Sequence, residues 1–171
     1  MPFDTPVERP AVVVRKMPPT PHLALVDIER RPGGPVVVLD TNVVLSALFA
    51  RPSQCAAILR RGASGEFRLT SSQAMWTELR ELLGGTFELE DADVDQWLRV
   101  IGGPFDTVPG AVPRVRQGGR ALSDGARRAL DTAVNARATY LVSSDPELLR
   151  IGLIQGVEIL SPPAFAALHG E

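Results

Sequence analysis

The sequence has few of the residues that build covalent frameworks or zinc sites. Its 171 residues include one cysteine, Cys55, so no intrachain disulfide can form and a reducing compartment is expected. The two histidines, His22 and His169, are too few and too far apart for a zinc site. Because the chain opens on acids and prolines and contains no run of eighteen apolar residues, we expect a cytoplasmic protein without a membrane span.

The net charge of the chain gives no general attraction to nucleic acid. Lys16 is the only lysine among 18 basic residues, and the formal net charge is -2. A polyanionic partner would therefore have to be attracted by a local cluster of arginines and not by the whole surface. With 44% hydrophobic and 22% charged residues, the composition is that of a globular protein with one sizeable core.

The chain divides at a glycine-rich junction. Residues 1–34 form a proline-rich N-terminal extension that ends in Arg31-Pro32-Gly33-Gly34, which is typical of a linker. Residues 35–171 are expected to form the folded domain. Five strand-like runs alternate there with helix-like segments, and this alternation predicts a parallel sheet with helices on both faces. The expected strands are Val36–Leu39, Phe67–Thr70, Phe105–Val108, Thr139–Ser143 and Val157–Leu160, and the expected helices are one capped by Ser53 and ending near Gly62, one capped by Ser72 and ending at Gly84-Gly85, and segments 91–101 and 123–137.

Three acids lie where such a fold would bring them together. Asp40 directly follows the apolar run Val36–Leu39, and Asp145 follows the strand-like TYLVSS, so both are expected at carboxyl ends of strands. Glu78 has mostly apolar helical neighbours and is expected to face the core side. Each also has an ordinary alternative: Asp40 can begin a turn or cap a helix, Asp145 with Pro146 is a good helix start, and Glu78 can pair with an arginine.

Carboxylates gathered at one edge favour a hard divalent cation such as Mg²⁺ or Mn²⁺, often with substrate phosphates completing the coordination. This predicts phosphodiester chemistry, in which a metal activates water and offsets charge on the phosphate. Thr41, Asn42 and Ser143 are polar neighbours that would support the ligands by hydrogen bonds.

Four segments carry a family resemblance: VVVLDTNVVLSAL, SSQAMWTELRELL, ATYLVSSDPELLRI and VEILSPPAFAAL. Together, over about residues 35–168, the chain resembles a PIN-domain protein of the bacterial type described as the toxin of a toxin-antitoxin pair. The resemblance implies a three-layer α/β/α sandwich around a central, mainly parallel five-stranded sheet. It also implies Mg²⁺- or Mn²⁺-dependent ribonuclease activity, a cognate antitoxin and a homodimer. By position, Asp40, Glu78 and Asp145 match acidic metal-site residues, and Asn42 and Ser143 match polar supporting residues.

The sequence departs from the family pattern at the next acidic position. Counting back from Asp145, the usual metal-site aspartate falls at Arg127, flanked at helical spacing by Asp124 and Asp131. Asp124 is preferred as the missing catalytic and metal-binding acid because it lies at the helix start, nearest the strand ends. Alternatively, Arg127 replaces the cation, and the domain is a catalytically inactive module that binds RNA or a protein partner.

Arginines also cluster around this helix. Between positions 114 and 137 lie six arginines and two acids, a local excess of positive charge in a chain that is acidic overall. Such a cluster can hold an RNA backbone through phosphate contacts, although a solvated loop and helix face explain it equally well. The expected RNA-binding residues are Arg114, Arg116, Arg120, Arg127 and Arg128.

Overall fold

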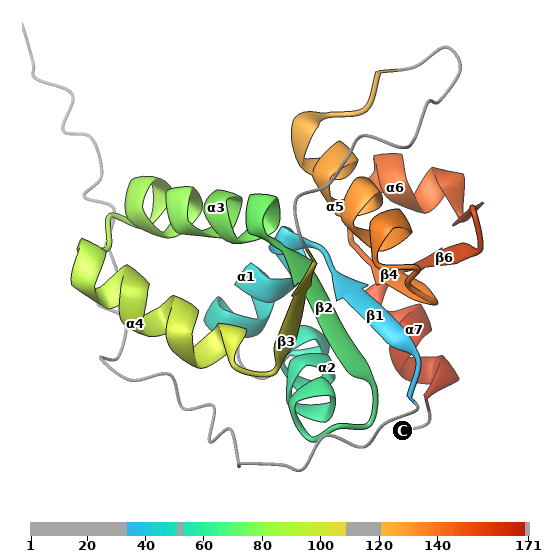
Figure 1. The fold of residues 1–171 in the computed structure, drawn as a ribbon, viewed down its shortest axis with the longest axis horizontal. Coiled ribbons are helices and arrows are strands. Elements are labelled where there is room, and N and C mark those ends of the chain that lie inside the picture. The colour runs from blue at the N-terminus through green and yellow to red at the C-terminus, as the bar shows by residue number, and fades with distance from the viewer. Residues whose placement is uncertain (1–33, 51–52, 109–120, 170–171) are drawn as a thin grey trace, which may run out of the picture.

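The computed structural model describes residues 34–50, 53–108 and 121–169. Helices and strands alternate along these residues (Figure 1), as the pattern of apolar runs predicts. The strands are β1 (Val36–Leu39), β2 (Arg68–Ser72), β3 (Phe105–Val108), β4 (Tyr140–Val142), β5 (Leu153–Ile154) and β6 (Val157–Leu160). The helices are α1 (Thr41–Phe49), α2 (Gln54–Ala63), α3 (Gln73–Glu81), the π-helical turn η1 (Leu82–Thr86), α4 (Asp91–Gly102), α5 (Asp124–Asn135), α6 (Pro146–Ile151) and α7 (Pro162–Leu168).

One sheet runs through the domain in the order β3-β2-β1-β4-β6-β5. Strand β1 is central and pairs in parallel with β2 on one side and with β4 on the other. Strands β3 and β6 extend the parallel sheet outwards. The α/β class and the five predicted parallel strands are therefore confirmed. Because all five strands point the same way, their carboxyl ends form a single edge of the sheet.

A sixth strand, β5, corrects the five-stranded expectation. It is two residues long and pairs antiparallel with β6 at the edge of the sheet. The turn between them contains Gln155 and Gly156, both at positive φ, 47° and 82°. Two consecutive residues at positive φ are typical of the tight hairpin turn whose twist suits two short strands. A two-residue strand carries too little apolar pattern to be recognised in the sequence.

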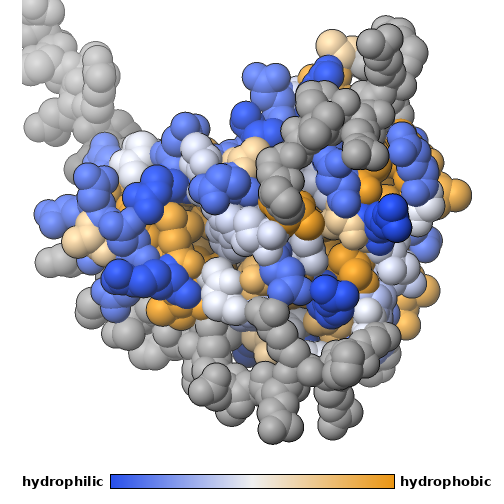
Figure 2. All heavy atoms as spheres, viewed as in Figure 1, coloured by the Kyte–Doolittle hydropathy of each residue, from blue (hydrophilic) through white to orange (hydrophobic). Residues whose placement is uncertain are grey.

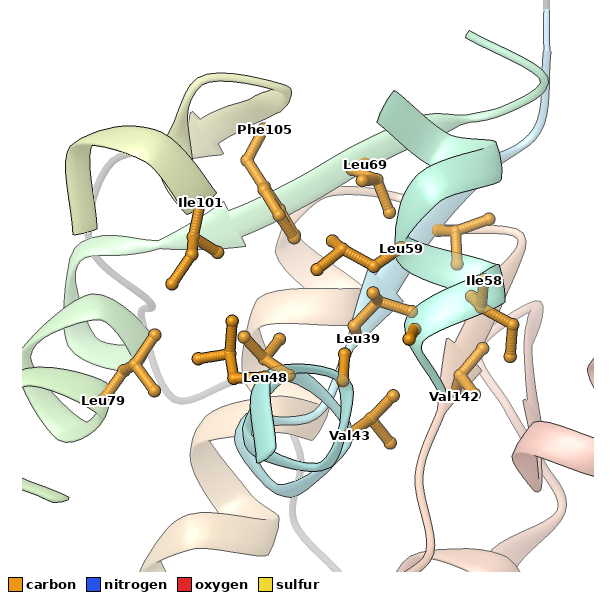
Figure 3. Packing of buried hydrophobic residues seen from close by; sticks show 14 of the residues in the cluster. Leu39, Val43, Leu48, Ile58, Leu59, Leu69, Leu79, Ile101, Phe105 and Val142 are labelled. Atoms are coloured by element: carbon orange, nitrogen blue, oxygen red, sulfur yellow. The ribbon is translucent and has the colours of Figure 1, made fainter. Parts of the chain in front are cut away.

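Two apolar clusters lie on opposite faces of the sheet. Along β1, Val37 and Leu39 point into the larger cluster, with residues of α1, α2, α4 and α7, whereas Val38 points into the smaller one, with α5 and α6. Figure 3 shows Leu39 packed among side chains of α1, α2 and neighbouring strands in the larger cluster. This alternation along one strand is what a three-layer arrangement requires, because successive side chains of a strand point to opposite faces.

Serine hydroxyls begin several helices, as the sequence predicts for two of them. Ser53 accepts a hydrogen bond from the Ala56 N–H and Ser72 from the Met75 N–H, which confirms both expected caps. Ser123 caps α5 in the same way. Asp40 also occupies an N-cap position, at the start of α1, but its side chain makes no capping hydrogen bond. Its carboxylate instead accepts a hydrogen bond from the Ser143 hydroxyl.

The remaining differences concern element ends. The regular helix α3 stops at Glu81, and the predicted continuation to Gly84-Gly85 is the π-helical turn η1. The N-terminal extension up to residue 33 and the arginine-bearing segment 109–120 lie outside the described residues.

Figure 2 shows hydrophilic side chains over α3 and α4, with apolar ones visible between the two helices.

Among the described ranges, no single helix is long and apolar enough to cross a membrane. Taken together, the consecutive helices α1 and α2 have the length and apolar composition of a membrane span, but they are bent by 103° relative to each other. Both helices contribute buried residues to the larger apolar cluster.

Candidate functional site

The site begins where two neighbouring strands end. Strands β1 and β4 are in register at Leu39 and Val142, so the residues that follow them, Asp40 and Ser143, lie side by side. The Ser143 hydroxyl donates a 2.6 Å hydrogen bond to Asp40 Oδ2. Only 5% of Asp40 is exposed, and Ser143 is fully buried. A buried carboxylate is thus held at the carboxyl edge of the sheet by a buried hydroxyl.

Burial makes ionisation of Asp40 costly. It raises the pKa of Asp40 from its usual value of 3.8 to about 6, against the opposing effects of hydrogen bonds from Ser143 and the Thr41 backbone. The negative charges of Glu78 and Asp145 add smaller increases to this pKa. Glu78 and Asp145, the other two acids that the sequence predicts at this edge, therefore both act electrostatically on Asp40.

Glu78 approaches this edge from α3. Its Oε2 atom accepts a 2.9 Å hydrogen bond from the Thr41 hydroxyl, and its Oε1 atom lies 3.4 Å from an Arg128 guanidinium nitrogen on α5. A β-carbon placed at Gly125 would lie 3.0 Å from the same Oε1 atom, so the absence of a side chain there lets Glu78 approach α5 closely. Pairing with an arginine, one of the two interpretations of Glu78, is confirmed, and a metal-ligand role stays a prediction.

Asp145 reaches the same region from the start of α6. Its side chain accepts a 2.8 Å hydrogen bond from the Glu147 N–H and caps α6, while its own N–H donates to the Ser143 hydroxyl at 2.9 Å. Ser143 thereby connects Asp40 to Asp145. The cap interpretation of Asp145 is confirmed, and one Asp145 oxygen is used by it.

Helix α5 presents different residues to the site from those expected. Gly125 and Arg128 face Glu78, whereas Asp124 and Arg127 are exposed. Among the ion pairs between described residues, none involves Arg127. The arginine at the acids is therefore Arg128, and the geometry does not favour Arg127 as the residue that replaces a cation.

Two further predicted residues, Asp131 and Asn42, differ in burial. Asp131 is buried within α5, where only 4% of it is exposed. Asn42 is exposed on α1, in contrast to its neighbour Thr41, which is buried and bonded to Glu78. The remaining expected RNA-binding residues, Arg114, Arg116 and Arg120, lie outside the described residues.

Two contributors to the site were missed. Gly125 makes room for Glu78, and Glu147 accepts a 3.1 Å hydrogen bond from the Ser123 N–H at the start of α5. The sequence offers a weak signal for Glu147, because an acid in the first turn of a helix is common. It offers none for Gly125, since the contact joins α5 to α3 across the sheet edge.

A comparison with protein families accounts for this arrangement. The model of the PIN domain matches residues 36–147, more than half of the chain. The chain belongs to the PIN-domain family. No curated protein matches it. PIN domains are generally nucleases and typically use divalent metal ions.

The acids of this PIN domain suit a divalent cation by donor chemistry and by charge. Asp40, Glu78 and Asp145 offer the hard oxygen atoms that Mg²⁺ and Mn²⁺ prefer, and their mutual repulsion would be relieved by a positive ion. In the part of the chain that the structure describes, however, no three such side chains form a metal-binding group. Two of the acids are engaged by protein groups: Glu78 contacts Thr41 and Arg128, and Asp145 contacts the first turn of α6.

Proposed function

We propose that this PIN-domain protein is an Mg²⁺- or Mn²⁺-dependent endoribonuclease that acts as the toxin of a toxin-antitoxin pair. The observation that carries the proposal is Asp40: a buried carboxylate at an N-cap position that makes no capping bond and experiences the charges of two further acids. A cap or a turn alone would be served as well by an exposed acid, whereas a buried carboxylate beside two further acids is costly to ionise.

Asp40, Glu78 and Asp145 would hold the cation, with Asp124 as the proposed fourth acid. When bound, the cation would lower the pKa of a water molecule and offset charge on the scissile phosphate. The chain's own residues prepare the ligands: Ser143 orients Asp40, and Thr41 orients Glu78, each through a side-chain hydrogen bond. Hydrogen bonds of this kind fix the direction of a ligand before the metal arrives.

The test is titration calorimetry with Mn²⁺ on the full chain and on Asp40→Asn. Asp93→Asn is a matched control, because Asp93 is exposed in the first turn of α4. We expect binding by the wild type and by the control, and at least about a hundredfold weaker binding by Asp40→Asn, because a neutral amide is a poor ligand for a hard cation. Cleavage of an RNA pool should then require Mn²⁺ and be lost in Asp40→Asn. Cleavage that persists in Asp40→Asn after removal of metal would refute the proposal.

The fourth ligand can be assigned by the same titration. Asp124→Asn should weaken Mn²⁺ binding more than Asp131→Asn if the exposed acid at the start of α5 reaches the ion. A larger effect of Asp131→Asn would assign the role to the buried acid. Both variants need a check of folding by circular dichroism, since Asp131 is buried.

The cognate antitoxin and the homodimer form part of the same proposal. They rest on the type of PIN-domain protein that the sequence resembles. A cytoplasmic location is proposed as well, because a chain with one cysteine suits a reducing compartment. Light scattering after size exclusion would test the dimer, which should have twice the mass of the 18.4 kDa chain. The antitoxin would be sought as a small protein whose coexpression abolishes RNA cleavage.

A further inference from the structure

Arg128 places a positive charge beside Glu78, an acid that the proposed function takes as a ligand of the cation. A terminal guanidinium nitrogen of Arg128 lies 3.4 Å from Glu78 Oε1. The side chain of Glu78 is 18% exposed and that of Arg128 is 40% exposed, so this pair is more enclosed than the Arg80–Asp95 pair on the outer side of α3, at 49% for both. Arg128 and a divalent cation would therefore compete for one carboxylate.

Side-chain hydrogen bonds, one of them buried, connect the helix of Arg128 to the start of α3. The Thr132 hydroxyl donates to the backbone carbonyl of Arg128 at 2.7 Å and lies 2.8 Å from the Ser72 hydroxyl. Ser72 in turn caps α3, the helix that carries Glu78. This chain of bonds fixes α5 against α3, so the side of α5 that carries Arg128 is held towards Glu78.

The contact between the two side chains is incomplete. Arg128 Nε is buried and has no hydrogen-bond partner within the described residues. The single distance of 3.4 Å between Arg128 and Glu78 is also longer than the distances in a two-pronged pair, in which guanidinium and carboxylate bind most tightly. Such a pair can be displaced by an ion of higher charge without the loss of a strong bond.

We propose that Arg128 is a positioning residue that holds Glu78 away from the cation, so that metal binding requires displacement of its guanidinium and is weakened by it. The inference rests on the proposed function, because it takes Glu78 as a metal ligand. It differs from the inactive alternative based on Arg127, since here the arginine lowers the affinity for the cation and does not abolish activity.

The test compares Mn²⁺ affinities measured by calorimetry for the wild type, Arg128→Gln, Arg128→Lys and Arg127→Gln. Removing the positive charge beside Glu78 should tighten Mn²⁺ binding roughly tenfold in Arg128→Gln, as expected for a unit charge a few ångströms from a divalent ion in a partly solvated site. Arg128→Lys keeps the charge and should stay near the wild-type affinity. Arg127→Gln removes an exposed arginine from the same helix and should change the affinity by less than about twofold.

The outcomes separate this inference from the proposed function. Binding by the wild type with equal or weaker binding by Arg128→Gln would overturn the inference and leave the metal-dependent function in place. Binding by Arg128→Gln alone would support the inference and show that the wild-type protein does not hold the ion unaided. If neither binds Mn²⁺, both the inference and the metal dependence fail. Equal tightening in Arg127→Gln would also overturn it, because the effect would then be one of net charge.

Discussion

Leu39 and Asp40 are adjacent, both almost fully buried, and opposite in what they contribute. Leu39, 1% exposed, ends β1 inside the larger apolar cluster, whereas Asp40, 5% exposed, begins the polar edge of the sheet. Several other buried polar residues gather near the same edge, in β2 and at the ends of β1 and β4. The middle of the sheet is built for stability, and its carboxyl edge keeps groups that cost stability.

Leu39→Ala should have the largest effect on folding. Removing a fully enclosed leucine leaves a cavity, so we expect the free energy of unfolding to fall by roughly 2–5 kcal/mol. Leu153→Ala is the matched control, because Leu153 is 68% exposed and its truncation should cost little. Urea denaturation followed by circular dichroism measures both. Similar losses in the two variants would contradict the assignment of Leu39 to the core.

Asp40→Asn should act in the opposite direction. Because folding raises the pKa of Asp40 from 3.8 to about 6, the folded protein is stabilised by the protonated form and loses that stability as the pH rises through this window. The neutral amide avoids this cost, so the variant should be more stable than the wild type by up to about 3 kcal/mol at pH 7.5. The difference should shrink to near zero at pH 4.

Thermal unfolding at the two pH values, with Asp93→Asn as control, checks the sign of this effect. A variant that is less stable than the wild type at pH 7.5 would mean that the carboxylate supports the fold. The contrast with Leu39 would then be lost, because both residues would be needed for stability.

Ser143→Ala tests the link between Asp40 and Asp145. The change removes a donor to Asp40 and an acceptor for the Asp145 N–H, both in a fully buried place, and should cost roughly 1–3 kcal/mol. Since the Ser143 hydrogen bond lowers the pKa of Asp40, that pKa should rise above its wild-type value, as measured by carboxyl NMR titration. Ser144→Ala, at an exposed neighbouring position, should change neither quantity.

Arg80→Gln should have the smallest effect. It breaks the Arg80–Asp95 ion pair between α3 and α4, in which both side chains are 49% exposed, and such surface pairs contribute about 0–1 kcal/mol. Urea denaturation at low and high salt should show a small difference that fades with salt. A loss above roughly 1 kcal/mol would place this pair with the buried edge and not with the solvated surface.

Much of the fold was predictable because local signals agree with it. β1, β3 and β6 have the residue ranges expected from their apolar runs, and Ser53 and Ser72 begin helices as their hydrogen-bonding chemistry predicts. β5 was missed because a two-residue strand depends on its pairing partner and on the hairpin turn, not on its own pattern.

The site was predictable only in part. Asp40 and Ser143 follow parallel strands, so their proximity needs only the strand direction and the register. The choice between Arg127 and Arg128 needs the rotation of α5 about its axis, which packing on β1 and α3 decides. Adjacent helical residues differ by about 100° in direction, so no count along the sequence separates them reliably.

By itself, the sequence determined the order of the five parallel strands, the position of Asp40 and Asp145 beyond strand ends, and the family. These depend on apolar periodicity and on short motifs, which are local properties of the chain. The tertiary structure alone decided the burial of Asp40, the approach of Glu78 to Gly125, and the contact of Arg128 with Glu78. Burial and charge contacts depend on which helix faces meet across the sheet edge, and that is a property of the packed molecule.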